Sequence, residues 1–456
     1  MARKLLFLIL VVAGLWSFTR SAGLTEQQAL SVAVFSASIG GTLLFWDFRL
    51  TFAFIGTSLL LLTRTIDIEH VVRFSSLEVI LFLVGMMIMV GVLKEDGFFA
   101  WITHRLLTIR RFTALKFVVL LSLVSALLSA LVSEVVSIIF IIAIILEICD
   151  HFETDPVPFV IISVLATNIG SAATVLGNPI GILIAIRSGL TFEDFLAKAL
   201  PLSVACLVVT IVLCALWYRK ELARMDTRIK GRGTFEHPPV QFKGELKTSL
   251  ALFVLTLVFI SFQRRLELLW GLEPNTILLV APLISSGIVM AWKCGSARHY
   301  VEKDVEWWTL LFFLLLFAQA GTLAYTGATE VLARKIQVLA GSSQAALTGM
   351  ILWIASIASA FLDNVVLVAA MLPVVQGFKS LGTSLQPLYW ALLFGGCLGG
   401  NITLIGSTAN IVALGILEKQ KGIKITFMRW FGIGLTVGVI TTCIVWAALA
   451  FIPAYR

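Results

Sequence analysis

The chain has 456 residues, of which 59% are apolar and 13% charged, and its mean hydropathy is +1.00. Globular proteins average about 45–50% apolar and about 25% charged residues, so this composition excludes a soluble protein. It predicts an all-α polytopic protein of a bacterial or archaeal plasma membrane. The formal net charge of +8 does not indicate nucleic-acid binding, because Lys and Arg stand in short connections between apolar runs.

The sequence offers no pattern for enzyme chemistry. The six cysteines are scattered without a CxxC pair, and the five histidines fall in or beside connections between apolar runs. Neither an HExxH nor a GxSxG motif is present. We therefore expect no enzyme activity, no metal site and no cofactor.

The first segment, residues 1–26, has two interpretations. Arg3 and Lys4 precede the apolar run Leu5 to Phe18, which is short for a span and suits a signal peptide. The small residues Ser21 to Gly23 resemble a cleavage site. We favour a retained first span, because polytopic membrane proteins rarely need a cleaved signal, and cleavage remains the alternative.

The rest of the chain alternates between apolar stretches and short connections. Stretches that suit a membrane span lie at 27–46, 50–64, 77–93, 157–186, 199–218, 248–263, 275–292, 306–325, 387–416 and 428–453. A polar connection at 219–247 separates the two halves. Two further runs, 117–146 and 346–378, are about 30 residues long, whereas one span needs about 20.

The two halves, 27–218 and 248–456, repeat. Residues 128–140 align with 358–370 at an offset of 230, and residues 170–182 align with 399–411 at an offset of 229. Internal repeats are typical of secondary transporters, whose binding sites lie near the membrane midplane where the repeats meet. The sequence therefore predicts a transport protein built from two repeats.

The basic connections predict how the two long runs lie. Both 104–116 and 219–247 are basic and belong on the cytoplasmic side. They reach the same side only if 117–146 enters the membrane and returns as a re-entrant hairpin. The basic segments 293–303 and 418–429 likewise reach the same side only if 346–378 forms a second re-entrant hairpin. We therefore predict eleven spans, two re-entrant hairpins and inverted repeats.

Two acids occupy matching places in the long runs. Glu134 is the only ionisable residue between 117 and 146, and Asp363 lies in the second run beside Asn364. A charged residue at the centre of a membrane helix costs about 2.5–3.5 kcal/mol on insertion scales, which suggests a use. We expect both acids to exchange protons or cations, with Asp363 the more important. A structural hydrogen bond at a hairpin turn is the alternative.

Glycine, proline and asparagine interrupt two later spans. Gly177, Asn178 and Pro179 predict a helix break in the first half, and Gly399, Gly400 and Gly406 predict one in the second. Broken helices expose backbone N–H groups that attract anions and carbonyls that hold cations. Close packing of helices at glycine is the alternative. The expected substrate-binding residues are Asn168, Gly170, Thr174, Gly177, Asn178, Asn401, Thr403, Gly406, Ser407 and Asn410.

Four segments resemble the ion transporter superfamily: LFLVGMMIMVGVLKEDGFF, SAFLDNVVLVAAMLP, NIGSAATVLGNP and CLGGNITLIGSTANIVA. This group includes arsenite permeases, D-type sodium/proton antiporters, citrate–metal carriers, the P protein and divalent-anion/sodium symporters. The resemblance covers the chain from about residue 27. It implies eleven spans, two re-entrant hairpins, and a homodimer held by scaffold helices around a moving transport domain.

The hairpin tips depart from the symporter pattern. The symporters carry Ser-Asn-Thr at both tips to bind sodium, whereas this chain has Ser133-Glu134-Val135 and Asp363-Asn364-Val365. The resemblance therefore implies ion coupling at Ser133, Glu134, Asp363 and Asn364, although at each tip the threonine is missing and a carboxylate is added. The first break also lacks the acid of the relatives' Gly-Asp-Pro-Pro-Asn. These departures leave the substrate open.

The function predicted from the sequence is secondary active transport by alternating access. The expected substrate is a small anion or oxyanion, such as arsenite or a di- or tricarboxylate, coupled to a proton or sodium gradient. A cation/proton antiporter using Glu134 and Asp363 is the main alternative. A channel would need a continuous polar pathway, and the polar groups cluster only at mid-depth. The expected partners are the substrate, the coupling ion and the lipid bilayer.

Overall fold

The computed structural model describes residues 2–21, 23–45, 48–107, 112–232, 244–341 and 343–455. All secondary structure in these ranges is helical, which confirms the predicted fold class. Residues 108–111 and 233–243, parts of two predicted basic connections, lie outside the described residues.

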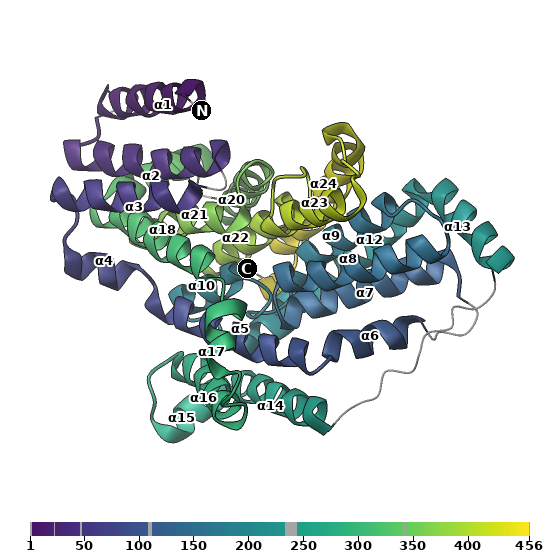
Figure 1. The fold of residues 1–456 in the computed structure, drawn as a ribbon. Coiled ribbons are helices and arrows are strands. Elements are labelled where there is room, and N and C mark those ends of the chain that lie inside the picture. Colours follow the sequence, from purple (N-terminus) through teal and green to yellow (C-terminus); the bar gives the residue numbers. More distant parts are fainter. Residues whose placement is uncertain are drawn as a thin grey trace.

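The helices follow the predicted apolar stretches (Figure 1). The first half contains α1 (Ala2–Ser21), α2 (Glu26–Leu44), α3 (Arg49–Leu62), α4 (Ile68–Phe74), α5 (Leu77–Glu95), α6 (Phe98–Leu107), α7 (Ala114–Leu131), α8 (Glu134–His151), α9 (Val157–Ser171), α10 (Pro179–Ser188), α11 (Phe192–Asp194), α12 (Leu200–Trp217) and α13 (Arg219–Arg232). The second half contains α14 (Gly244–Ser261), α15 (Gln263–Trp270), α16 (Thr276–Trp292), α17 (Ala297–His299), α18 (Trp307–Tyr325), α19 (Ala328–Ala340), α20 (Gln344–Ser359), α21 (Asn364–Gly377), α22 (Gln386–Gly399), α23 (Thr408–Lys421) and α24 (Phe427–Phe451). Within the described ranges, nine helices are long and apolar enough to cross a membrane.

Most helices run between two ends of the bundle, which we name after residues that lie there. α5 and α18 are antiparallel. At the Lys94 end, Lys94 pairs with Asp304 before α18 (3.5 Å). At the Ser76 end, where α5 begins, the rings of Phe74 and Tyr325 lie 6.3 Å apart. In Figure 1, α13 lies on the right, towards the Lys94 end, and α4 lies on the left, at the Ser76 end.

The first long apolar run forms a helical hairpin, as predicted. α7 and α8 are antiparallel, because the ring of Phe112 before α7 and the ring of Phe152 after α8 lie 5.9 Å apart. The hairpin runs from its tip towards the Lys94 end, because Phe140, six residues into α8, stacks on Phe99 of α6, just beyond Lys94 (3.5 Å). Its tip is the turn at residues 132–133.

The second long run forms a hairpin from the opposite side. Gln344 in the first turn of α20 donates to the carbonyl of Ser384, which lies beyond α21 (3.0 Å). α19, which follows α18 at the Ser76 end, packs against α21, with Ala333 facing Gly377. The two hairpins therefore enter the bundle from opposite ends. The number of spans and the inverted repeats remain predictions.

Both predicted helix breaks are confirmed. The first separates α9 from α10, where Asn178 caps the new helix by accepting from the Gly181 amide (2.9 Å). The second separates α22 from α23, which is capped by Ser407. Each broken helix packs closely on the first leg of its own hairpin, α9 on α7 and α22 on α20.

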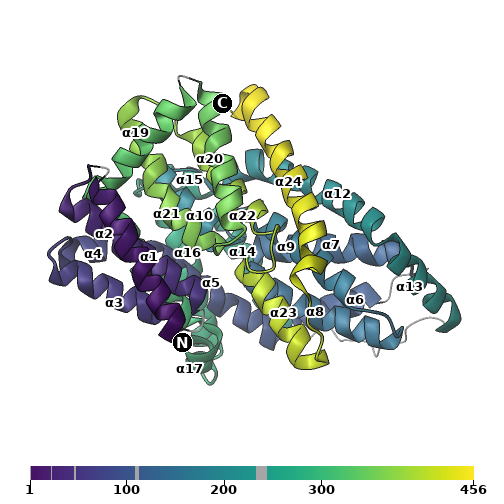
Figure 2. The same cartoon turned by 90° about the horizontal axis from the view of Figure 1, so that it is seen from above.

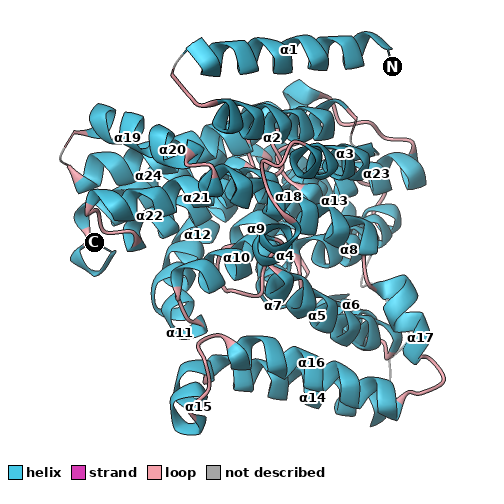
Figure 3. Ribbon diagram, turned by 90° about the vertical axis from the view of Figure 1, so that its left-hand side faces the viewer, coloured by secondary structure: helices cyan, strands magenta, loops and turns pink. Residues whose placement is uncertain are grey.

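The remaining helices form a framework in which each half supports the other. α5 packs on α16, and α18 packs on α3. The first contact is close, because Gly85 lies directly against Pro282. Figures 1 and 3 show α1 at one edge of the molecule and the α14–α16 group at the opposite edge.

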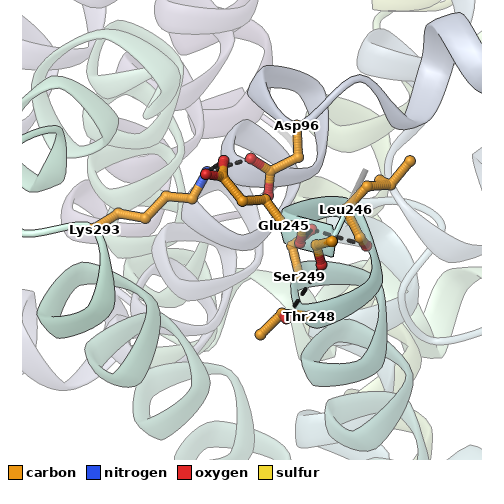
Figure 4. A network of polar contacts seen from close by, with 7 residues as sticks. Asp96, Glu245, Leu246, Thr248, Ser249 and Lys293 are labelled. Carbon is orange, nitrogen blue, oxygen red and sulfur yellow. Dashed lines mark hydrogen bonds and ion pairs between the residues drawn. The ribbon is translucent and has the colours of Figure 1, made fainter. Parts of the chain in front are cut away.

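An ion-pair network joins three of these helices at the Lys94 end (Figure 4). Lys293, just after α16, pairs with Asp96 at the end of α5 and with Glu245 at the start of α14 (3.6 Å to the latter). Burial opposes the charge on Lys293, but the hydrogen bond to Asp96 and the negative charges of Asp96, Glu95 and Glu245 together outweigh it, so the pKa of Lys293 is raised. Lys293 therefore remains charged and holds the α14–α16 group against α5.

The hairpin arrangement predicts which surfaces share a side of the membrane. Thr227→Cys on α13 and Gln420→Cys at the end of α23 are expected to react with an impermeant maleimide from one side, and Ser384→Cys from the other. All three side chains are exposed, so a cysteine should be reactive. The measurement is labelling of intact and permeabilised cells in a cysteine-free background. Reaction of Thr227→Cys and Gln420→Cys from opposite sides would refute the hairpin topology.

Candidate functional site

The tips of the two hairpins meet the two helix breaks in the middle of the bundle. Figure 2 shows α9, α10 and α22 at this central position. α8 packs against α23, and α21 packs against α10, so each hairpin contacts the broken helix of the other half. The first residue of α8, Glu134, and the cap of α21, Asp363, are both buried, with 3% and 5% exposure. The site is therefore built equally from both halves.

Glu134 has an oxygen without a partner. The side chains of Asn364 and Ser171 adjoin its carboxyl group, and the Asp363 carboxyl lies within electrostatic range. Among the described residues, neither Glu134 Oε2 nor either amide atom of Asn364 has a hydrogen-bond partner. Buried polar groups are normally paired, because leaving one unpaired costs free energy. A proton on the carboxyl, or a cation bound between these groups, would remove that penalty.

Asp363, in contrast, uses both of its oxygens. Oδ1 accepts from the backbone amide of Val365 at the start of α21 (3.0 Å). Oδ2 accepts from the hydroxyl of Thr408, the first residue of α23 (2.5 Å). Asp363 thus caps its own helix and fastens the second hairpin tip to the second break. This is the structural role that the sequence left open as the alternative.

Thr174 and Thr403 perform the same task in the two halves. The Thr174 hydroxyl donates to the carbonyl of Ala130 near the first hairpin tip, and Thr403 donates to that of Ala360 near the second. Each hydroxyl also accepts from the backbone amide two residues later, at 3.1 Å and 3.3 Å respectively. These matched bonds support the predicted repeat and fix each break to the hairpin of its own half.

Four of the predicted polar residues bond mainly to one another. Asn168 donates to the side-chain oxygens of Asn401 (2.9 Å) and Asn410 (3.0 Å), and it accepts from the Ser407 hydroxyl (3.0 Å). Asn410 donates to two backbone carbonyls of the second break, at 2.8 Å and 2.9 Å. All four residues are fully buried. In this state, their polar groups hold the first half to the second.

Asn178 has a different environment. Its side-chain nitrogen donates to the hydroxyl of Ser171 (3.0 Å) and to the sulfur of Cys397 (3.2 Å). Asn178 and Ser407 cap equivalent helices, and Cys397 is the counterpart of Asn168 at an offset of 229. The contact of Asn178 with the Cys397 thiol therefore corresponds, in the other half, to the contact of Ser407 with the Asn168 amide.

The predicted glycines are explained by close backbone contact. A side chain at Gly170 would collide with the backbone of α7. At Gly177 it would collide with the carbonyl of Ser171. Gly406 lies in the same way against the backbone of Gly400, 2.8 Å from the position of a Cβ atom. These positions need glycine for packing, which was the alternative to a direct role in binding.

A cavity of about 210 Å³ leads to the first hairpin tip. It lies between α8 on one side and α5 and α18 on the other. Of the predicted residues, only Ser133, Glu134 and Asn178 line it. Lys94 and Lys303 line its other end, and both are exposed, so the cavity begins at the Lys94 end.

At the Ser76 end, a hydrogen bond joins α10 to the start of α5. Arg187 at the end of α10 donates to the hydroxyl of Ser76, which precedes α5 (2.6 Å). Ser76 is buried and has a φ of +50°, a strained value for a residue other than glycine. The Arg187–Ser76 bond therefore joins α10 to the start of α5 at the end opposite the mouth of the cavity.

Sequence analysis missed the polar wall that faces Glu134 across the cavity. Thr309 and Glu306 of the α18 start line the cavity, and Arg49 donates to the Thr309 hydroxyl (2.9 Å). The Arg49 guanidinium also lies 5.5 Å from the centre of the Phe312 ring. The sequence signal for this polar wall was Arg49 itself, an arginine that directly precedes an apolar stretch. Ser171 and Cys397 were missed although both stand within segments that carry the resemblance.

Comparison with known proteins identifies the family of the chain. Residues 43–395 match the family described as citrate transporter. An uncharacterized transporter of Mycobacterium bovis is 34% identical over 367 residues, which cover 80% of this chain and 83% of that protein. The P protein of Homo sapiens is 27% identical over 449 residues, covering 82% of this chain and 53% of the P protein.

A solved structure shares the fold. The crystal structure of the YdaH transporter from Alcanivorax borkumensis has a TM-score of 0.52 to this chain, at 16% identity, and covers 81% of this chain and 84% of its own. Relatives in mycobacteria and cyanobacteria place the protein in a bacterial plasma membrane. The resemblance to the ion transporter superfamily is confirmed. The chain is a multi-pass membrane transporter that belongs to the citrate transporter family.

Proposed function

We propose that the protein is a secondary active transporter of a small anion or oxyanion, driven by a proton or sodium gradient. The observation that carries this proposal is Glu134, which lines the cavity at the first hairpin tip and whose Oε2, like the adjoining Asn364 amide, has no hydrogen-bond partner among the described residues. A carboxyl and an amide without partners can bind an ion when the cavity admits it. A gradient-driven carrier needs such a group at the place where its substrate binds.

The helix breaks supply a place for an anion beside this ion site. α10 begins with Pro179 and α23 with Thr408, and both residues line the cavity. The start of a helix carries partial positive charge and attracts anions. Asn178 lines the cavity at the start of α10, and one of its two donor contacts is weak, because a thiol is a weak acceptor.

Alternating access is supported by the difference between the two ends. The cavity reaches Glu134 from the Lys94 end, while Arg187 bonds to Ser76 at the other. We propose that the opposite state breaks the Arg187–Ser76 bond and closes the cavity. A homodimer is also proposed. It is supported by the outer face of the α14–α16 group, where Val254, Leu255 and Ile284 are exposed.

A cation/proton antiporter is the second candidate. It is favoured by the two acids, Glu134 and Asp363, which lie within electrostatic range of each other. In that mechanism, a proton and a cation would compete for the Glu134 carboxyl. The anion site at the helix starts would then have no transport role.

Transport assays in proteoliposomes distinguish these functions. Citrate and arsenite are tested as substrates under an imposed proton or sodium gradient, and accumulation above the outside concentration is expected for one of them. Collapse of the gradient should abolish accumulation. Sodium/proton exchange without any anion dependence would favour the antiporter, and anion flux that only equilibrates would indicate a channel.

The first prediction concerns ion coupling. Glu134→Gln keeps the size of the side chain but removes its charge, so we expect loss of gradient-driven accumulation with substrate exchange retained. Asp363→Asn is the matched comparison, because its amide oxygen can keep the cap on Val365 while its NH2 group donates to the Thr408 hydroxyl, which then acts as acceptor. We expect it to reduce accumulation less. Gradient-driven accumulation at the wild-type level and pH dependence in Glu134→Gln would place coupling elsewhere.

The second prediction separates two asparagines of the broken helices. Asn178→Ala should weaken substrate binding by about 10- to 100-fold, since a hydrogen bond to a charged ligand contributes about 1.5–3 kcal/mol. Asn410→Ala should instead lower the melting temperature, because it removes two hydrogen bonds to backbone carbonyls of the second break and one of the two acceptors of the Asn168 amide. Ligand titration and thermal unfolding of both purified variants provide the test. Equal affinities in Asn178→Ala and wild type would exclude Asn178 from the binding site.

A further inference from the structure

The strongest feature outside the transport site is the surface of α13. This helix follows α12 almost directly and packs on α7 through Leu222 and Met225, which are buried. Its opposite face is exposed and strongly basic. The basic residues on that face are Arg219, Lys220, Arg224, Arg228 and Lys230.

Most of these charges are not used within the protein. Arg219, Lys220, Arg224 and Lys230 form no ion pair with any other residue that the structure describes. Positive charges immediately after a membrane helix are attracted to anionic lipid headgroups. α12 ends in exposed Leu216 and Trp217, the type of residue found at the membrane–water interface. The basic face therefore begins where headgroups are expected.

The other residues of α13 hold both legs of the first hairpin at its base. Asp226 Oδ1 accepts from the backbone amide of Ala114, the first residue of α7 (2.7 Å). Arg228 pairs with Glu153, just beyond α8 (3.6 Å). The helix that carries the unused charges thus contacts the hairpin that carries Glu134.

We propose that the basic face of α13 binds anionic phospholipid headgroups and that this binding stabilises the base of the first hairpin. The membrane would then influence the hairpin from the surface, without contact with the transported substrate. A basic face that serves only to orient the chain during insertion needs no preference for one lipid over another. This difference makes the proposal testable, and the test does not depend on which substrate the protein carries.

The binding test compares two charge-neutralised forms of the full chain. The test variant carries Lys220→Gln, Arg224→Gln and Lys230→Gln. The matched control carries Arg334→Gln, Lys335→Gln and Lys379→Gln, three exposed cations at the Ser76 end. Melting temperatures are measured in nanodiscs with rising phosphatidylglycerol in phosphatidylcholine.

We expect phosphatidylglycerol to raise the melting temperature of the wild type and the control by several degrees, and 0.5 M salt to weaken the effect. The test variant should need about tenfold more phosphatidylglycerol for the same rise. An equal response of the test variant and the control would overturn the proposal. So would an equal rise on addition of inorganic phosphate, because the surface would then bind free anions.

Hydrogen exchange tests the link to the hairpin. Amides in the first turn of α7 should exchange more slowly in nanodiscs containing phosphatidylglycerol than in phosphatidylcholine alone. The control should behave in the same way, and the test variant should show no difference. Exchange that is independent of the lipid in the wild type would refute stabilisation of the hairpin base. Because neither measurement uses transport, failure here leaves the proposed function unaffected.

Discussion

Inside a bilayer, a chain that leaves the helical conformation exposes backbone N–H and C=O groups that water cannot satisfy. The centre of this protein contains four such places: two hairpin tips and two helix breaks. Their polar residues are arranged to meet this constraint. Thr174 and Thr403 bond to the carbonyls near the tips, Asn178 and Ser407 cap the new helices, and Asn410 bonds to the carbonyls of the second break. Most of the polar side chains at the centre of the protein therefore pair with backbone groups that the hairpin tips and helix breaks expose.

This explains which features the sequence could predict. The hairpins followed from the parity of basic connections, and the breaks followed from glycine and proline, because charge and backbone chemistry act locally. The partner of each polar side chain could not be predicted. Asn178 and Asn410 are the same residue type beside equivalent breaks, yet one borders the cavity and the other is enclosed by hydrogen bonds. That difference depends on the residue that each asparagine meets in the other half, which is a thiol for Asn178 and an amide for Asn410. The sequence pattern does not tell which residues of the two halves will be in contact.

The two acids show the same limit. The sequence favoured Asp363 over Glu134 because Asn364 follows it directly. In the folded protein, Asn364 adjoins Glu134 from the other half, whereas Asp363 is occupied by Val365 and Thr408. Where the two hairpin tips meet, the acid that adjoins Asn364 is therefore Glu134 of the other hairpin, although Asp363 is the neighbour of Asn364 in sequence. The polar wall of Arg49 and Thr309 was missed for a related reason, since residues at the ends of spans resemble ordinary interfacial residues.

The close backbone contacts at glycine have a consequence for which helices could move together during transport. Gly170 lies against the backbone of α7, and Gly399 lies equally close to Ser356 of α20. Backbones in such contact leave no space for one helix to slide past the other, so each hairpin and its broken helix behave as one body. The Asn168 network then joins the two bodies. An ion bound at Glu134 and a substrate bound at Asn178 would then move together with these helices. The ratio of ions to substrate in each transport cycle would be set by this helix packing and not by gates that open at different times.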